Sequence, residues 1–159
     1  MSKVISFEHC LSMEAVSLKD CEHIFKQASL LMRSDRKVSQ SLQGARAALL
    51  FFEPSVRTLM SFSLALSQLS IDYCAPSMAV VGSSVKAERL EDKIYYLASL
   101  GFNMLIVRHH VLRWWEPVLS SLPKGLSFSL INAGDSDGGG ANFGEAAVAS
   151  AGIPVRVFK

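Results

Sequence analysis

A short run of hydroxyl and guanidinium residues follows the first strongly apolar segment of the chain. Ser55, Arg57 and Thr58 come soon after residues 47–52, with Pro54 breaking the segment between them. A helix that begins here points its free backbone N–H groups outward, and these carry partial positive charge. Two hydroxyl donors and a guanidinium that grips phosphate through parallel bonds add the chemistry of an oxyanion site. The alternative is that Ser55 is only a helix N-cap and Arg57 a solvated helix residue.

A second cation follows another apolar segment. Arg108 comes directly after residues 104–107. If that segment is a buried strand, Arg108 lies at the rim of the sheet and faces a ligand crevice; the alternative is a surface arginine. His109 and His110 are adjacent, so in an extended segment they are expected to point apart and to chelate one metal poorly. We interpret both as structural or solvent-facing.

Two other loops carry weaker signals. Residues 82–86 offer two hydroxyls and the ammonium of Lys86 to an anion, but most loops of this kind are only solvated. Residues 132–140 hold Asp135, Asp137 and four of the ten glycines. Their spacing fits neither a calcium loop nor a phosphate-binding glycine loop, which favours an ordinary glycine-rich loop. The sequence therefore predicts no metal site and no cofactor.

Strands and helices alternate from residue 46 to the end. Short apolar segments bounded by turn residues are typical of strands buried on both faces, and apolar stripes at three- and four-residue steps are typical of surface helices. The expected strands are residues 47–52, 72–74, 78–81, 104–107, 127–131 and 155–158. The expected helices are residues 17–33, 55–69, 90–100, 111–122 and 142–151, the first capped by Ser17.

This order predicts a single α/β domain whose open, mostly parallel sheet has helices on both faces. Ligands of such sheets bind beyond the carboxyl ends of the strands. Residues 53–58, 108–110 and 132–140 should therefore be neighbours in space. For Trp114 and Trp115 core packing is the first expectation and a subunit contact the second.

Composition excludes several classes of protein. The 159 residues suit one domain, and 50% hydrophobic against 19% charged residues excludes intrinsic disorder. A net charge of +2 without a basic run argues against nucleic-acid binding. No apolar stretch approaches the ~18 residues of a membrane span, and the amino terminus lacks the apolar core of a signal peptide. Three widely spaced cysteines indicate reduced thiols and a cytoplasmic protein.

Four motifs in order resemble those of the carbamoyltransferases. FFEPSVRT resembles the FFEPSTRT signature of that family, and GSSVKAERLEDKI resembles its second loop, SSxxKGExLxDT. VRHH resembles the RHP segment, and INAGD resembles the INAGDG segment of the aspartate branch. Order and spacing agree over about residues 17–145.

The resemblance implies the fold of an amino-terminal, carbamoyl-phosphate-binding domain over residues 1–159. It also implies a reaction of pyrimidine synthesis, in which the amine of aspartate attacks carbamoyl phosphate and phosphate leaves. The residues it places on the phosphate are Ser55, Val56, Arg57, Thr58 and Arg108, with Arg57, Thr58 and Arg108 catalytic. Ser84 and Lys86 match a loop that reaches a neighbouring subunit's site within a trimer.

The chain also departs from the family pattern. Val56 replaces a threonine of the signature, and Ala87 replaces a glycine of the second loop. Where the family has His-Pro-Thr-Gln, whose His and Gln bind the carbamoyl group, residues 140–143 read GANF. The family's second, aspartate-binding domain is expected to be absent, since the chain stops at Lys159.

These departures leave three interpretations open. The first is a domain that binds carbamoyl phosphate or phosphate, forms a trimer, and does not turn over alone. The second is a non-catalytic paralogue that acts as scaffold or regulatory partner in a hetero-complex with a true carbamoyltransferase. The third is a truncated or degenerate gene product.

Overall fold

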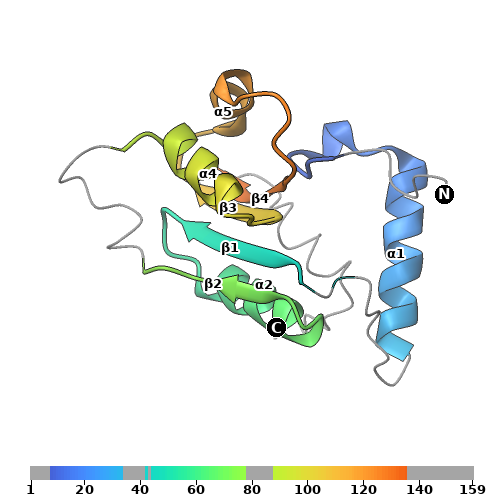
Figure 1. Ribbon diagram of the computed structural model, residues 1–159. Helices are drawn as coiled ribbons and strands as arrows, with labels where there is room; N and C mark the ends of the chain where they lie inside the picture. The colour runs from blue at the N-terminus through green and yellow to red at the C-terminus, as the bar shows by residue number, and fades with distance from the viewer. Residues whose placement is uncertain (1–7, 34–41, 43, 78–87, 136–159) are drawn as a thin grey trace.

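The computed structural model describes residues 8–33, 42, 44–77 and 88–135 (Figure 1). Several predicted features lie outside these residues: the strands 78–81 and 155–158, the helix 142–151, the loop that carries Ser84 and Lys86, and the glycines 138–140.

A four-stranded parallel sheet forms the centre of the described chain. Its strands are β1 (Arg46–Phe51), β2 (Asp72–Cys74), β3 (Met104–His109) and β4 (Ser129–Asp135), in the order β2-β1-β3-β4. Leu49 of β1 pairs with Ile106 of β3, which pairs in turn with Ile131 of β4. The open α/β sheet that the sequence predicts is therefore confirmed, as a single domain.

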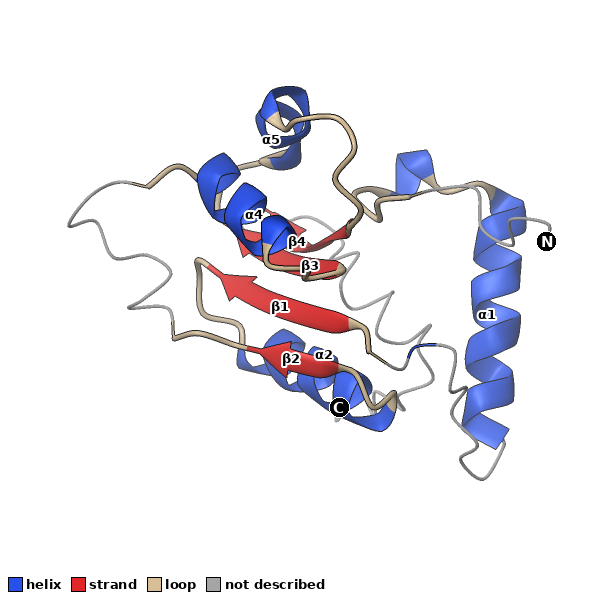
Figure 2. Cartoon of the chain, in the orientation of Figure 1, coloured by secondary structure: helices blue, strands red, loops and turns tan. Residues whose placement is uncertain are grey.

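Helices cover both faces of this sheet. The described helices are α1 (Leu18–Arg33), α2 (Val56–Gln68), α4 (Leu90–Ser99) and α5 (Trp115–Ser121), with a short 3-10 helix at Met13–Ala15, and α2, α4 and α5 are the ones on the faces. Figure 2 shows α2 on one side of the strands and α4 and α5 on the other.

The side chains of β1 divide between two core clusters. Leu49 and Phe51 pack in the cluster that contains Phe62 of α2, whereas Leu50 packs in the cluster that contains Ile94 of α4 and Val118 of α5. Successive strand residues point to opposite faces, so a strand covered on both sides must be apolar throughout. This explains why β1 is a continuous apolar run.

Helix α1 lies at the end of the sheet where β1 begins, away from the arrowheads in Figure 1. The Asp20 N–H donates to Ser17 Oγ at 3.1 Å, so the predicted N-cap is confirmed. The predicted apolar stripe is only partly buried: Ala28 is buried, but Leu18 and Phe25 are 84% and 57% exposed. The helix instead turns a side that contains the buried Asp20 inward, and the Ser17 hydroxyl donates to the Asp20 carboxylate at 2.6 Å.

The two tryptophans belong to the core. Trp114 and Trp115 are 2% and 8% exposed and meet edge to face, with ring centroids 5.7 Å apart. Core packing, the first expectation for this pair, is confirmed.

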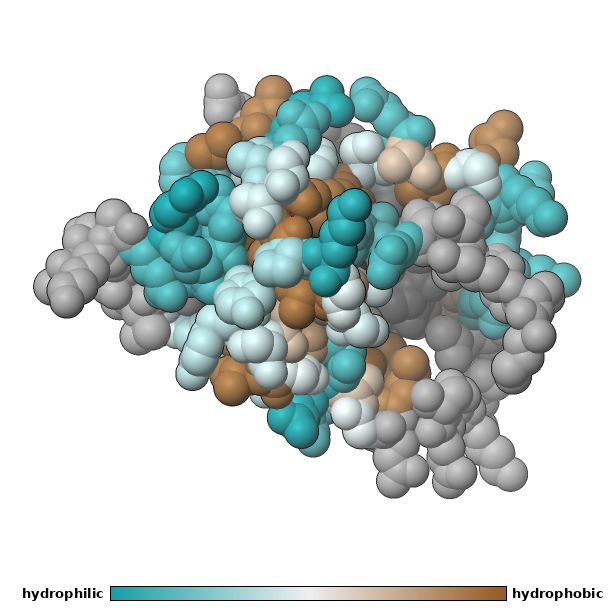
Figure 3. Space-filling view, turned by 45° about the horizontal axis from the view of Figure 1, so that its top comes forward, coloured by the Kyte–Doolittle hydropathy of each residue, from teal (hydrophilic) through white to brown (hydrophobic). Residues whose placement is uncertain are grey.

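Some apolar side chains remain at the surface. Val56, Met60 and Leu64 lie one helical turn apart along α2 and are 49–74% exposed. On the face seen in Figure 3, hydrophobic side chains form separate groups divided by hydrophilic ones. No helix among the described residues is long and apolar enough to cross a membrane.

Candidate functional site

The junction between β1 and α2 carries the residues that the sequence predicts to bind an anion. Ser55 occupies the N-cap position of α2, but its hydroxyl makes no capping bond to a backbone N–H. It instead bonds to Thr58 Oγ1 at 2.9 Å. The first turn of a helix leaves its N–H groups without intrahelical partners, and at this junction those groups belong to Val56, Arg57 and Thr58. Ser55 therefore does not fill the site that it borders.

The side chains at this junction differ in burial. Thr58 is 3% exposed and holds the hydroxyl of Ser55, whereas Val56 is 74% exposed and Arg57 is also exposed. A hydroxyl pair is thus fixed by packing, and a guanidinium lies beside it at the surface. The described geometry is compatible both with an anion ligand and with a solvated Arg57.

Arg108 is part of β3 rather than a residue that follows it. It pairs with Phe51 in the register of β1 and β3, and its carbonyl accepts the Phe52 N–H at 2.9 Å. Arg108 is thereby placed at the carboxyl end of β3, beside the chain that leads from β1 into α2. The predicted neighbourhood of Arg108 and the segment that follows β1 is observed at Phe52 and Glu53.

The side chain of Arg108 is held in place by two oxygen acceptors. Its Nη2 lies 2.7 Å from Glu53 Oε1, and its Nη1 donates to the Ala133 carbonyl at 3.1 Å. Only 15% of the side chain is exposed, so the alternative of a surface arginine is wrong. The structure thus joins the carboxyl ends of β1, β3 and β4 through one guanidinium.

The INAGD segment is a strand, not the start of a loop. The sequence predicts a loop from residue 132, but β4 continues to Asp135. Its outer edge is bonded to the amino-terminal segment, where the Asn132 N–H donates to the Cys10 carbonyl at 2.9 Å. Asn, Gly and Asp are turn formers, and here a partner distant in sequence outweighs that local preference.

Asn132 is a buried polar junction. Its Nδ2 donates to the Leu11 carbonyl and to Asp135 Oδ1, both at 3.1 Å. Its Oδ1 accepts the Gly134 N–H at 3.0 Å and Trp114 Nε1–H at 3.3 Å. Because these bonds satisfy both ends of the amide, the buried side chain adds stability rather than a desolvation cost.

The segment after β3 is a turn, although the sequence predicts a helix from Val111. Helix α5 begins only at Trp115. The Val111 N–H donates to His109 Nδ1 at 3.0 Å, and the Arg113 N–H donates to Asp135 Oδ2 at 2.9 Å. Arg113 has a φ of 54°, which a regular helix excludes. Side-chain acceptors thus replace the helical hydrogen bonds of this segment.

The two histidines do not point apart as expected. Their rings stack with centroids 4.4 Å apart, and His109 also contacts the ring of Phe52 at 4.9 Å. The strand irregularity between Val107 and His109 re-aims these side chains. Burial, followed by the neighbouring His110, lowers the pKa of His109, and Glu53 acts in the opposite direction. The structural role predicted for His109 is confirmed.

The described residues contain no metal-binding cluster, and their cysteines are not paired. Within those residues, no group of three or more His, Cys, Asp or Glu side chains is arranged to hold a metal ion. Cys10, Cys21 and Cys74 are free, and burial raises the pKa of Cys10 to about 12.

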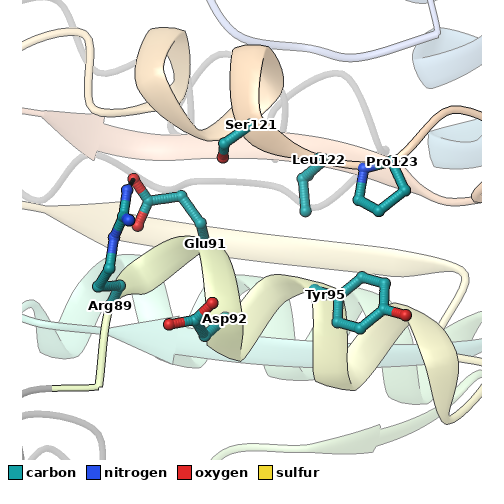
Figure 4. A pocket seen from close by; sticks show the side chains of 7 residues that line it. All are labelled: Arg89, Glu91, Asp92, Tyr95, Ser121, Leu122 and Pro123. Carbon is teal, nitrogen blue, oxygen red and sulfur yellow. Dashed lines mark hydrogen bonds and ion pairs between the residues drawn. The ribbon is translucent and has the colours of Figure 1, made fainter.

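A pocket of about 290 Å³ lies between α4 and the end of α5. Figure 4 shows the residues that line it: Arg89, Glu91, Asp92, Tyr95, Ser121, Leu122 and Pro123. Arg89 and Glu91 pair with each other at 3.1 Å. None of the residues predicted to bind phosphate lines this pocket, so it is separate from the β1–α2 junction.

Comparison with known proteins identifies the family. The model of the aspartate/ornithine carbamoyltransferase, carbamoyl-P binding domain matches residues 8–139. The chain belongs to this family. The predicted resemblance is thereby confirmed at the level of this domain.

Relatives of the chain include aspartate carbamoyltransferase catalytic subunits. That of Caldicellulosiruptor bescii is 37% identical over 132 residues, covering 80% of this chain and 41% of the relative. That of Prochlorococcus marinus is 35% identical over 135 residues, covering 82% of this chain and 39% of the relative. The chain thus spans about two fifths of the length of the relatives it matches.

Solved structures agree with this assignment. The aspartate transcarbamoylase of Trypanosoma cruzi in complex with carbamoyl phosphate has a TM-score of 0.69 and 29% identity, covering 81% of this chain and 41% of that one. The catalytic subunit from M. jannaschii has a TM-score of 0.67 at 24% identity and supports the fold alone.

Sequence reasoning missed two residues that build this site. Glu53 follows the first predicted strand directly. A carboxylate beside a predicted anion site would repel the anion unless it pairs with a cation, so its position indicates a partner among the arginines of the site. Asn132 follows a buried apolar run, where a polar residue needs bonded partners.

Proposed function

We propose that this domain binds carbamoyl phosphate, or phosphate, at the carboxyl ends of β1 and β3. The ligand would take the first-turn N–H groups of α2 together with the side chains of Ser55, Arg57, Thr58 and Arg108. The observation that carries the proposal is the start of α2, where Ser55 bonds Thr58 and leaves the first-turn amides uncapped by its side chain.

The substrate class follows from the family and from the charge of the site. A helix start and two guanidinium groups favour an oxyanion with two negative charges. A structure of the related enzyme from Trypanosoma cruzi holds carbamoyl phosphate. Val56 contributes its N–H here but no hydroxyl.

The reaction that we propose is transfer of the carbamoyl group to aspartate. The amine nitrogen bonds to the carbamoyl carbon and loses a proton, the bond from that carbon to the phosphate oxygen breaks, and phosphate leaves with the electron pair and takes up the proton. Arg57, Thr58 and Arg108 would stabilise charge on the leaving phosphate, an effect worth ~10²–10³ in rate per donor. Since the chain spans two fifths of its relatives, we propose that further sequence or another chain supplies the aspartate site.

Assembly is part of the same proposal. Ser84 and Lys86 match the loop that this family places in a neighbouring subunit's site, so we propose a trimer with shared sites. Both residues lie outside the described part of the chain.

A second candidate is a non-catalytic partner of a complete carbamoyltransferase. It is favoured by residues 140–143, which read GANF where the family carries a His and a Gln. Assay of carbamoyl-aspartate formation with radiolabelled carbamoyl phosphate, alone and mixed with a complete carbamoyltransferase, separates the two candidates.

Thermal unfolding with added anion tests the binding proposal. Carbamoyl phosphate, phosphate and phosphonoacetate should each raise the melting temperature, with about 2.7 kcal/mol of stabilisation at a hundredfold excess over Kd. Arg57→Ala should abolish the rise. Arg89→Ala, which removes an exposed arginine of the separate α4 pocket, should retain it. A melting temperature that millimolar anion leaves unchanged in the parent chain would refute the proposal.

A further inference from the structure

The outer edge of β4 is covered by the segment Glu8 to Leu11, which we call the amino-terminal strap. The Cys10 N–H donates to the Leu130 carbonyl at 2.7 Å, and the Asn132 N–H donates to the Cys10 carbonyl at 2.9 Å. Cys10 and Ile131 thus form a parallel bridge. The strap protects an edge that would otherwise present unpaired backbone groups.

One bond of this edge departs from a regular ladder. The pattern around Cys10 predicts that the Leu130 N–H should donate to the carbonyl of Glu8. It donates instead to Nδ1 of His9, at 3.2 Å. The imidazole has therefore replaced a backbone carbonyl, and its ring also rests against Phe128, with centroids 5.7 Å apart.

The chemistry of this bond makes it depend on protonation. A backbone N–H can only donate, so Nδ1 must carry a lone pair and the neutral ring holds its proton on Nε2. Protonation would place an N–H of the imidazolium against the N–H of Leu130. The same event would place a positive charge in a half-buried position.

We propose that His9 is a pH-sensitive latch that holds the amino-terminal strap on β4 while neutral and releases it when protonated. This inference does not depend on carbamoyl phosphate binding. Release would also remove the Leu11 carbonyl from Asn132 Nδ2, which lies 3.1 Å away. The latch thereby connects the strap to the polar junction at the carboxyl end of β4.

The groups around His9 favour the neutral form. Burial lowers the pKa of His9, and the negative charge of Glu8 acts in the opposite direction. Cys10 is the other titratable neighbour in the strap, and with a pKa of about 12 its thiol stays neutral across the range of the latch. Phe128 and Leu130 bring no charge from the β4 side.

The expected size of the effect follows from linkage. A released imidazole titrates near pH 6.5. If the closed form stays neutral, the equilibrium constant for strap closure at pH 5.5 is therefore about tenfold lower than at neutral pH. Hydrogen exchange of the Leu130 and Asn132 amides, read by NMR as protection factors in the whole chain, measures this directly. Protection should fall about tenfold between pH 7.5 and 5.5.

Matched variants separate the latch from general acid sensitivity. His9→Asn places an amide oxygen near the position of Nδ1 and does not titrate, so protection should persist at pH 5.5. Glu8→Gln should move the loss of protection to lower pH. His23→Asn, on α1, should leave the pH response of the parent chain unchanged.

Two results would overturn the proposal. One is constant protection of Leu130 and Asn132 in the parent chain down to pH 5.5. The other is an equal fall of protection in the parent and in His9→Asn. The first result needs no variant, so the test stands even if a substitution impairs folding.

Discussion

Arg108 and Glu53 form an ion pair across the carboxyl ends of β3 and β1, with 2.7 Å between Nη2 and Oε1. The Ala133 carbonyl holds the neighbouring Nη1 at 3.1 Å. An anion at the start of α2 would therefore meet a guanidinium that already has a negatively charged partner. Glu53 both positions Arg108 and opposes the ligand for which Arg108 is proposed.

The first prediction concerns the negative charge of Glu53, which opposes an anion bound near Arg108. Glu53→Gln keeps the shape of the side chain and removes its charge, so phosphate should bind more tightly, by about three- to tenfold, which is about 0.7–1.4 kcal/mol. The same change should lower the free energy of unfolding by about 1–3 kcal/mol, because it weakens the partner of a largely buried cation. Calorimetric titration with phosphate and urea unfolding measure the two effects.

The control is an acid in a comparable pair at the surface. Glu116 lies 2.8 Å from Arg113, and both side chains are 56% exposed. Glu116→Gln should change neither phosphate affinity nor stability by more than a few tenths of a kcal/mol. Weaker phosphate binding in Glu53→Gln would show that Glu53 aids the anion site rather than opposing it.

The parallel sheet could be predicted because its signals are local. Residues 47–52 and 104–107 are short, apolar and bounded by turn formers, and the ends of the observed strands differ from the predicted ends by no more than two residues. The placement of Arg108 near the β1–α2 junction followed, since the carboxyl ends of parallel strands share one edge.

The failures share one physical cause. The extension of β4 to Asp135 depends on the strap, which lies more than a hundred residues earlier in the chain. The turn at Arg113 depends on the Asp135 carboxylate, which accepts its N–H. Propensity describes a residue's own backbone preference, whereas these bonds come from distant partners that a single sequence does not reveal.

The second prediction is a pH dependence of stability. His109 has its pKa lowered in the folded chain, so the unfolded chain binds more protons below pH 6.5. Its stabilising contribution is therefore complete above that pH and declines as the pH falls, by up to about 1.4 kcal/mol per pH unit. His109→Asn keeps an acceptor for the Val111 N–H and should reduce this decline. Urea unfolding at pH 7.5, 6.5 and 5.5 measures it, and identical slopes in parent and variant would contradict the assignment.

The third prediction concerns thiol reactivity. Only the thiolate reacts with alkylating agents, and a pKa of about 12 leaves about one Cys10 in 10⁴ ionised at pH 8. Burial also raises the pKa of Cys74, but that thiol is exposed at the sheet edge. Mass spectrometry after iodoacetamide treatment should find Cys74 modified well before Cys10 in the native chain. Urea should abolish the difference, and equal rates in the native chain would show that Cys10 is not protected.

The fourth prediction tests Asn132 as the polar junction of β4, the strap and the turn before α5. Asn132→Ala removes four hydrogen bonds and leaves the buried Nε1–H of Trp114 without its acceptor, so the free energy of unfolding should fall by about 2–4 kcal/mol. Trp114→Phe removes the donor of the same bond and provides the other arm of a double-mutant cycle. Because the two side chains are in contact, their effects should not add, and the coupling should be about 0.5–1.5 kcal/mol. Strict additivity in urea unfolding would mean that the Trp114–Asn132 bond contributes nothing and that the cost of Asn132→Ala arises from its bonds to Leu11, Asp135 and Gly134.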